Sequence, residues 1–165
     1  MSAVTQNQLI AQNRRAQYDY FIDEQFEAGL VLYGTEIKSL RCGSASINEA
    51  YADIHAEGLY LFNSYIPPYK QAHHLEQHEK RRVRKLLLHR RQIKKILGAI
   101  RRKGITLITM SLYITSRGRA KIQLGLAHGK RKVDKRATIK EREWNRDKQR
   151  LMRNRTKHSF FKKDV

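Results

Sequence analysis

The sequence predicts a mainly β protein, an antiparallel barrel of the OB-fold type with about six strands, flanking helices and a basic C-terminal tail. Three observations lead to this prediction. Apolar and polar residues alternate in several short stretches separated by turn signals, and a single segment has strong helical periodicity. From Gly129 to Arg136 the chain reads Gly-Lys-Arg-Lys-Val-Asp-Lys-Arg, and beyond it the sequence is charged almost without interruption. Alternation alone does not distinguish a barrel from a sandwich of two sheets.

The first half of the chain contains four expected strands and a short helix. Residues 1–12 are polar and unpatterned, so we expect a flexible N-terminus. Thr35 is the expected N-cap of a helix that ends near Gly43. Glu57-Gly58 marks a hairpin turn, and Pro67-Pro68 closes the unit. The expected strands are Tyr18–Asp23, Glu27–Tyr33, Tyr51–Ala56 and Leu59–Ile66.

The second half contains the strongest helix signal. Residues 70–85 are polar, rich in histidine and then basic, which predicts a loop. A helix is expected over residues 90–103, because its isoleucines and leucine recur at helical spacing and Gly104 stands at the C′ position. Two strands with alternating side chains follow, over residues 108–114 and 120–126, joined by a turn at Arg117-Gly118.

Charge is the strongest global property of the chain. Its 35 Lys and Arg against 15 Asp and Glu give a formal net charge of +20 over 165 residues. Such an excess favours binding to polyanions, nucleic acid first among them. An anionic membrane fits less well, because no apolar run approaches the length of a membrane span.

The N-terminus has no apolar stretch typical of a signal peptide, and the single Cys42 suits a reducing compartment, so we expect a cytoplasmic protein.

The tail differs from the body in composition. Residues 130–165 contain 15 Lys and Arg against 5 acidic residues. Ala137, Trp144 and Leu151 are spaced by seven, so a helix here would have a narrow apolar stripe. No second apolar face is available to pack on the body. We therefore expect a folded body over 13–128 and a tail over 129–165 that is disordered when free and helical when bound.

Two features of the body suggest RNA contacts. Twelve Lys and Arg and no acid lie between Lys80 and Lys103. One interpretation is a solvated helix face, and the other, which we favour, is phosphate contact by part of this surface. Tyr18, Tyr20 and Phe21 follow Asn13-Arg-Arg15 and could stack on a splayed base, or could simply fill the barrel.

Signals for catalysis are weak. His73-His-Leu-Glu-Gln-His78 has two histidines at i, i+4 (His74 and His78), but the stretch lacks the apolar face of a zinc-binding helix. No phosphate loop, nucleophile elbow or pair of carboxylates is present, and Cys42 has no histidine near it in sequence. We expect no catalytic residues, no metal and no cofactor.

Several stretches, in order, resemble one family, the small protein B (SmpB) family of bacterial proteins that bind transfer-messenger RNA (tmRNA, also called SsrA). The matching segments span residues 13 to about 155. They are Asn13-Arg-Arg-Ala16, Glu27-Ala-Gly29, Gly34-Thr-Glu-Ile-Lys-Ser-Leu-Arg41, Arg84-Lys-Leu-Leu-Leu88, Leu112-Tyr113, Gly129–Arg136 and Ile139-Lys-Glu-Arg-Glu-Trp144.

The resemblance implies a barrel that binds the tRNA-like domain of tmRNA and brings it, with elongation factor Tu and GTP, to stalled 70S ribosomes for trans-translation. The body would stand in for an anticodon arm. The tail would fold in the empty mRNA channel beside the decoding centre and 16S rRNA. The protein itself would catalyse no reaction and would contact no membrane.

The resemblance also assigns residues. The tmRNA contacts would be Asn13, Arg15, Tyr18, Tyr20, Glu27, Lys121, His128, Lys130 and Arg131. The ribosome contacts of the tail would be Val133, Asp134, Lys135, Arg136, Trp144, Leu151 and Met152. Three positions depart from the family pattern, where Lys is common in place of His128 and of Arg131, and a ring-bearing residue in place of Val133.

Two alternatives stay open at this point. A ribosomal or general RNA-binding protein with a basic extension would explain the charge, although not the Trp-Leu stripe. A small RNA-processing enzyme would require an acid and base pair brought together by the fold.

Overall fold

A computed structural model describes residues 7–55, 58–73, 77–101, 104–130, 139–140, 143–150 and 152. The chain divides into two compact units, Met1–Gly129 and Lys130–Val165, and each is described by itself. In the second unit, residues 139–140, 143–150 and 152 are helical, and the side chains of Trp144 and Met152 are 70% and 60% exposed.

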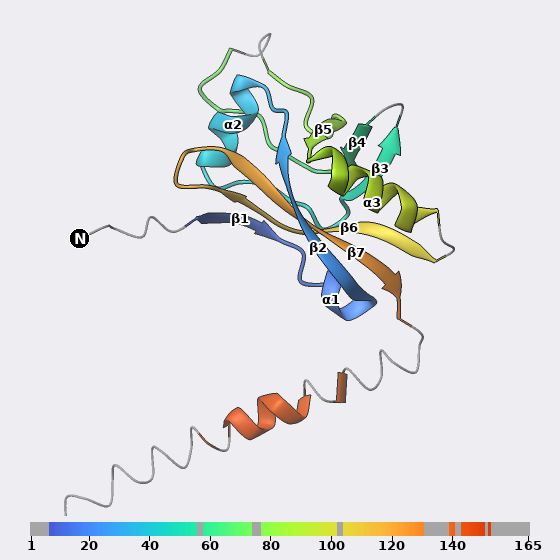
Figure 1. Cartoon of the computed structure of the whole chain (residues 1–165). Helices are drawn as coiled ribbons and strands as arrows, with labels where there is room; N and C mark the ends of the chain where they lie inside the picture. Colours follow the sequence, from blue (N-terminus) through green and yellow to red (C-terminus); the bar gives the residue numbers. More distant parts are fainter. Residues whose placement is uncertain are drawn as a thin grey trace, which may run out of the picture. The chain divides into compact units, whose positions relative to one another are not determined.

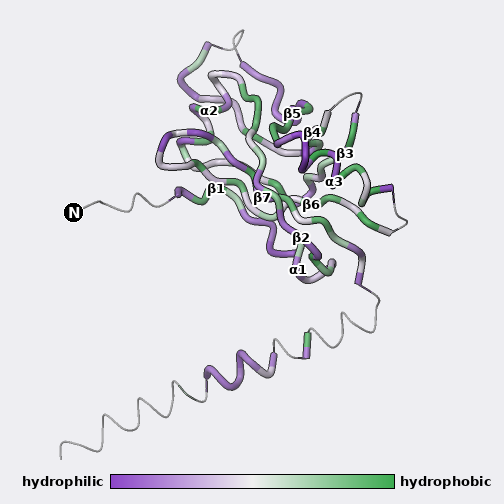
Figure 2. Tube along the Cα trace, in the orientation of Figure 1, coloured by the Kyte–Doolittle hydropathy of each residue, from purple (hydrophilic) through white to green (hydrophobic). Residues whose placement is uncertain are grey.

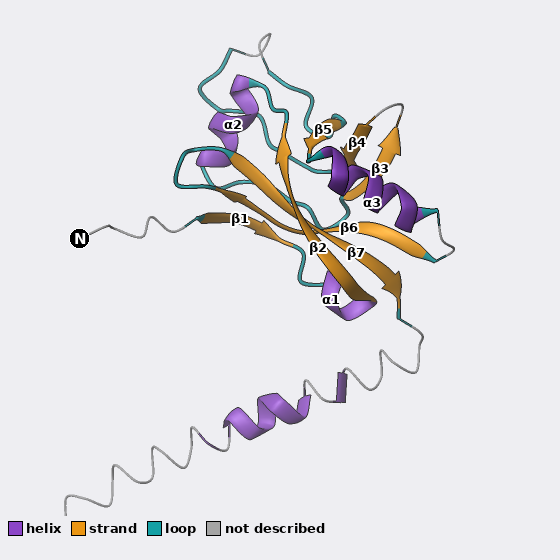
Figure 3. Ribbon diagram, viewed as in Figure 1, coloured by secondary structure: helices purple, strands orange, loops and turns teal. Residues whose placement is uncertain are grey.

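The first unit alternates short helices with antiparallel strands (Figure 1, Figure 3). The strands are β1 (Gln8–Gln12), β2 (Tyr20–Leu30), β3 (Tyr51–His55), β4 (Gly58–Phe62), β5 (Arg84–Leu87), β6 (Ile105–Ile114) and β7 (Ala120–Gly129). The helices are α1 (Ala16–Asp19), α2 (Gly34–Arg41) and α3 (Arg90–Ile100).

The strand pairings close a circuit. β2 pairs with β7, β7 with β6, β6 with β3, β3 with β4, β4 with β5, and β5 again with β2. Every pair is antiparallel, and β1 adds to β6 outside the circuit. The prediction of a mainly β protein of antiparallel strands with flanking helices is therefore confirmed.

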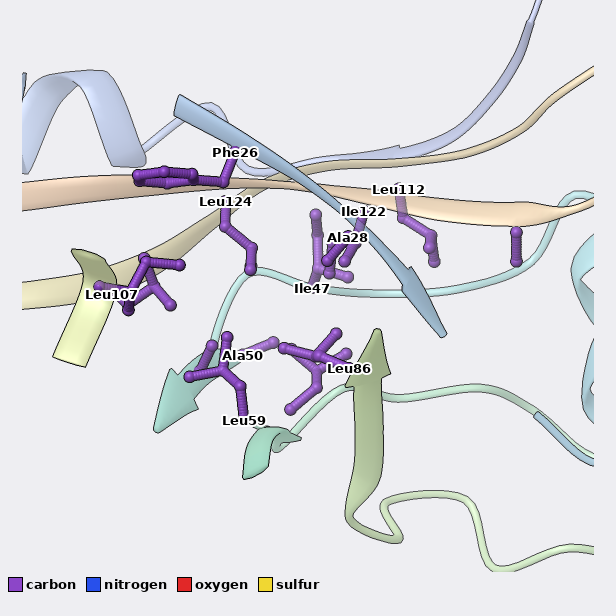
Figure 4. Packing of buried hydrophobic residues seen from close by; sticks show 14 of the residues in the cluster. Phe26, Ala28, Ile47, Ala50, Leu59, Leu86, Leu107, Leu112, Ile122 and Leu124 are labelled. Carbon is purple, nitrogen blue, oxygen red and sulfur yellow. The ribbon is translucent and has the colours of Figure 1, made fainter. Parts of the chain in front are cut away.

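The inner faces of the strands form one hydrophobic core. Alternate residues of β2, β4 and β7 point inward, and Ala28, Leu59, Leu61, Ile122 and Leu124 are at most 1% exposed. Figure 4 shows Ala28, Leu59, Ile122 and Leu124 among the packed side chains of the core, and Figure 2 shows apolar and polar stretches along the trace. The period-2 pattern that predicts each strand thus also fixes which side chains remain outside.

Helix α3 closes one side of the core. Ile96 is fully buried, and Ile100 packs against the same cluster. The helix is shorter than the predicted range of 90–103, but Gly104 has the expected positive φ of 86° that only glycine adopts without strain. Gly118, in the turn between β6 and β7, has a φ of 74°.

Several expectations about elements need correction. A flexible segment over 1–12 is wrong for Gln8–Gln12, which pair with β6. The two strands predicted within residues 18–33 are one strand, β2, because a register shift between Ile22 and Glu24 accommodates the break in alternation. Residues Tyr18 and Asp19 belong to α1.

Thr35 does not cap α2. The helix begins at Gly34, and the Thr35 hydroxyl lies 3.0 Å from Nδ1 of His78. The cap is supplied instead by Glu36, whose Oε2 accepts the backbone N–H of Tyr33 at 2.7 Å. Glu at this third helical position makes half of a capping box, which satisfies a backbone donor at the helix start.

The loop predicted over 70–85 ends in a strand. Arg84 and Lys85 belong to β5, and Arg84 points into the protein with no exposed surface. Its guanidinium lies 2.8 Å from Oε1 of Glu36 and donates to the carbonyl and hydroxyl of Ser64 at 2.7 and 2.8 Å. An arginine in a sequence is normally expected at the surface, so the residues of β5 showed no alternation of apolar and polar side chains.

Candidate nucleic-acid interface

The outward side of β2 and β7 carries a ladder of polar side chains, which we name the β2–β7 face. Its members are Gln25, Glu27, Lys121 and Gln123. They lie outside because Phe26 and Ala28 of β2, and Ile122 and Leu124 of β7, take the inward positions. Neighbours along each strand therefore point to opposite sides, which leaves this polar set facing solvent.

Glu27 is the centre of the ladder. Its carboxylate accepts hydrogen bonds from the Tyr113 hydroxyl and from Lys121 Nζ, the latter at 2.9 Å, and its side chain is 48% exposed. The hydrogen bond from Tyr113, followed by that from Lys121, holds the pKa of Glu27 below its ordinary value. Burial and the bond to Glu27 raise the pKa of Tyr113 to about 12. The face thus holds a fixed carboxylate beside a fixed cation.

One further pair, Gln25 with Gln123, continues the ladder, and the pair of Asp23 with His128 lies beyond it, where a register shift interrupts β2 and alternation places His128 on the other side of β7. Gln123 Nε2 donates to Gln25 Oε1 at 3.1 Å. His128 Nδ1 lies 3.2 Å from Asp23 Oδ2, and its ring centroid is 5.3 Å from that of Phe21. Both side chains of the His128–Asp23 pair are about half exposed, at 47% and 48%. Donors, acceptors and rings are all available here to an RNA strand.

A shallow groove of about 420 Å³ borders the face. It is lined by Glu27, Leu87, Leu88, His89, Gln92 and Lys121. Leu87 is 53% exposed, and the sequence analysis did not single it out. Leu86 and Leu87 are neighbours in β5, so one of the two must point outward. Leu87 therefore offers apolar contact beside the Glu27–Lys121 pair.

The predicted contacts near the N-terminus have structural roles as well. The Asn13 side chain accepts the backbone N–H groups of Arg15 and Ala16 at 3.1 and 3.2 Å, which starts α1. Tyr20 is half-buried against a small cluster formed by Ala16, Ile108 and Ala127. This cluster is separate from the main core, so the buried part of Tyr20 packs outside the interior of the barrel.

The remaining predicted contacts divide between the two units. Arg15 is exposed and Tyr18 half-buried, Glu27 and Lys121 lie on the β2–β7 face, and the exposed His128 lies near the end of β7 beside Asp23. Lys130 is described and half-buried. The other positions fall outside the described residues: Arg131, Val133, Asp134, Lys135, Arg136 and Leu151.

The basic segment 80–103 is not one surface. Arg82 and Arg84 both bind Glu36, whose side chain is completely buried, and Arg82 also lies with its guanidinium carbon 4.0 Å from the centroid of the Tyr33 ring. Burial alone would raise the pKa of Glu36, but the hydrogen bond from Arg82, the N–H of Tyr33 and the charges of both arginines outweigh it, so this pKa lies below its ordinary value. These two arginines hold α2 to β5 and are not available to phosphate.

His78 is a buried structural residue. Its Nε2 lies 3.2 Å from the carbonyl oxygen of Ile66, opposite the contact with Thr35. Within the described ranges, no group of three or more His, Cys, Asp or Glu side chains is arranged to hold a metal ion. The described part of the chain also has no helix long and apolar enough to cross a membrane.

Comparisons with known proteins agree with this geometry. A family model described as "SmpB protein" matches residues 10–154. The chain is 56% identical over 144 residues to an SsrA-binding protein of Caulobacter vibrioides, covering 87% of this chain and 94% of that protein. It is 52% identical over 146 residues to an SsrA-binding protein of Sphingomonas elodea, covering 88% of this chain and 91% of that one.

A solved structure is similar in fold and in sequence. It is described as "tmRNA-SmpB: a journey to the center of the bacterial ribosome", and its chain is 43% identical with a TM-score of 0.62. The match covers 78% of this chain and 92% of that chain. With the family model matching most of its length, the chain belongs to the SmpB family.

Proposed function

We propose that this protein is an RNA-binding factor that binds the tRNA-like domain of tmRNA through the β2–β7 face and brings it to stalled ribosomes for trans-translation. The observation that carries the proposal is the 43% identity to a solved chain described as SmpB with tmRNA at the bacterial ribosome. The SsrA-binding relatives at 52% and 56% identity support the same RNA.

The chemistry of the face supports RNA as the ligand. Lys121 supplies a cation for a phosphate, and Glu27 can accept hydrogen bonds from ribose hydroxyls or base amino groups, which Lys and Arg cannot do. Because Tyr113 and Lys121 already orient the carboxylate, little side-chain freedom is lost when RNA binds. Asn13, Arg15, Tyr18, Tyr20, His128, Lys130 and Arg131 complete the proposed contact set.

The finer part of the proposal concerns the ribosome. The body takes the place of an anticodon arm, elongation factor Tu with GTP joins through tmRNA, and the tail enters the empty mRNA channel. The proposed tail contacts are Val133, Asp134, Lys135, Arg136, Trp144, Leu151 and Met152. The exposure of Trp144 and Met152 leaves both apolar side chains available for such contact. The protein would carry out this function in the cytoplasm.

The proposal is tested by measuring the affinity of Lys121→Met for the tRNA-like domain. Losing one charge-assisted contact should weaken binding by about tenfold or more. Lys70→Met is the matched control, since Lys70 is exposed in the loop after Pro68 and lies outside the proposed face. Equal affinities for both variants and the unchanged protein would contradict the assignment of this face. Equal affinity of the unchanged protein for any structured RNA would favour a general RNA-binding function.

A further inference from the structure

Helix α3 presents a stripe of positive side chains to solvent. Arg90, Lys94 and Arg101 fall within a sector of about 40° around the helix axis at 3.6 residues per turn. Arg91 and Lys95 lie beside them, and all five side chains are exposed. The opposite side of the helix, centred on the buried Ile96, packs on the barrel.

Little in the fold neutralises this stripe. Across the residues that the structure describes, the only ion pair made by these five cations is that of Lys95 with Glu24 of β2. The sequence between Lys80 and Lys103 contains no acid that could supply another within the segment. Arg82 and Arg84 differ in this respect, because both are neutralised by Glu36. Arg90, Arg91, Lys94 and Arg101 therefore have no ion pair within the described residues.

The arrangement opposes helix formation. Arg90 with Lys94, and Arg91 with Lys95, place like charges four residues apart, where they repel. The first turn contains no acidic residue, although negative charge is favoured at that end of a helix. A sequence selected only for a stable helix would avoid this pattern. A bound polyanion would relieve both penalties at once.

We propose that the exposed stripe of α3 is a second phosphate-binding surface that contacts the backbone of an RNA duplex, in addition to the β2–β7 face. The groove lined by Glu27 and Lys121 also contains His89 and Gln92, so the β2–β7 face borders the start of α3. A membrane is disfavoured as the partner, because the apolar side of α3 is already buried in the core and cannot insert. The surface binds phosphates, which every RNA sequence has, so it contributes affinity without sequence preference.

The test compares two double variants that remove equal charge. K94Q/R101Q removes two cations of the stripe and leaves His89 and Gln92 intact, while K70Q/R117Q removes two exposed cations from loops. Binding to the tRNA-like domain and to an unrelated RNA hairpin is measured by fluorescence anisotropy across a salt series. If each stripe cation neutralises one phosphate at roughly 0.9 in log–log slope, K94Q/R101Q should flatten the slope by about 1.8.

The same estimate gives a second readout. Between about 50 and 200 mM salt, the affinity advantage of the unchanged protein over K94Q/R101Q should shrink by about twelvefold. Circular dichroism should show an intact helix, because Gln, Lys and Arg have similar helix propensities. Slopes that stay unchanged, or that flatten equally in K70Q/R117Q, would overturn the proposal. It would also be overturned if K94Q/R101Q kept its RNA affinity and lost only binding to anionic vesicles. If the unchanged protein bound the tRNA-like domain and the hairpin with equal affinity, that result would instead count against the proposed function.

Discussion

At the scale of single residues, two glutamates of similar appearance in the sequence have different roles. Glu27 is half exposed on the β2–β7 face, whereas Glu36 is buried between two arginines. The sequence indicated Glu27 only through the resemblance to a family. It gave no reason to pair Glu36 with Arg82 and Arg84, because partners 46 and 48 positions away come together only in the folded chain.

Glu36→Gln should destabilise the body strongly. Removing one partner of a buried ion pair leaves uncompensated charge, which costs about 3–5 kcal/mol. Glu49→Gln is the control, because Glu49 meets Arg81 at 3.5 Å with its side chain 74% exposed, where a pair contributes less than about 1 kcal/mol. Urea denaturation of both variants measures the difference in free energy of unfolding. Similar small losses in both would show that the Glu36 network contributes little to stability.

Tyr113 should titrate unusually high. Its pKa of about 12 in the folded protein lies above the ordinary value of 10.0, so its contribution to stability is complete below pH 10 and is lost as the pH rises toward 12. The tyrosinate absorbance of the unchanged protein minus that of Tyr113→Phe isolates this group. Glu27→Gln should move the midpoint toward its ordinary value, while Glu24→Gln should leave it unchanged. A midpoint near 10 in the unchanged protein would contradict the Glu27–Tyr113 bond.

At the scale of elements, the sequence predicted best where periodicity was uninterrupted. Apolar residues recur at helical spacing in α3 and at every second position in β6 and β7, and Gly104 was recognisable as a residue that follows a helix end. The misses have physical causes. β5 was missed because a buried arginine interrupts its apolar pattern, and β1 because an edge strand with a largely exposed pattern carries weak alternation.

Two glycines of the α3 region should respond with opposite sign to the same substitution. Gly98→Ala should stabilise the protein by up to about 1 kcal/mol, because alanine favours a helix and no other heavy atom lies within 4 Å of the added Cβ. Gly104→Ala should destabilise it by about 1–2 kcal/mol, since its φ of 86° strains any residue with a Cβ. Thermal unfolding of the two variants measures both shifts. Shifts of equal sign would contradict the positive φ of Gly104.

At the scale of the whole molecule, the ring of strands explains how distant residues reach one face. β2 and β7 are about a hundred residues apart in sequence, yet their pairing puts Glu27 beside Lys121. Local sequence patterns predicted the strands but not their neighbours, so this pairing could not be derived from periodicity alone. The family resemblance indicated Glu27 and Lys121 of this face, whereas Gln25 and Gln123 were identified only from the fold.

The tail and the body should be separable in function. Deleting residues 132–165 keeps Lys130 and Arg131, and should weaken binding to the tRNA-like domain by less than about tenfold, since salt screens cations outside the contact. The same deletion should abolish peptide tagging on stalled ribosomes in a reconstituted translation reaction. Collapse of RNA binding would show that the tail belongs to the tmRNA site.

The most direct test of the central claim is to identify the RNA that the protein binds in a cell. The full chain with an affinity tag is expressed in a bacterium that lacks its own SmpB-family gene, and the RNA that is purified with it is sequenced. One dominant species, tmRNA, is the predicted result, and Lys121→Met should reduce its recovery more than Lys70→Met. A broad mixture of ribosomal and messenger RNA, unchanged by either variant, would contradict the account.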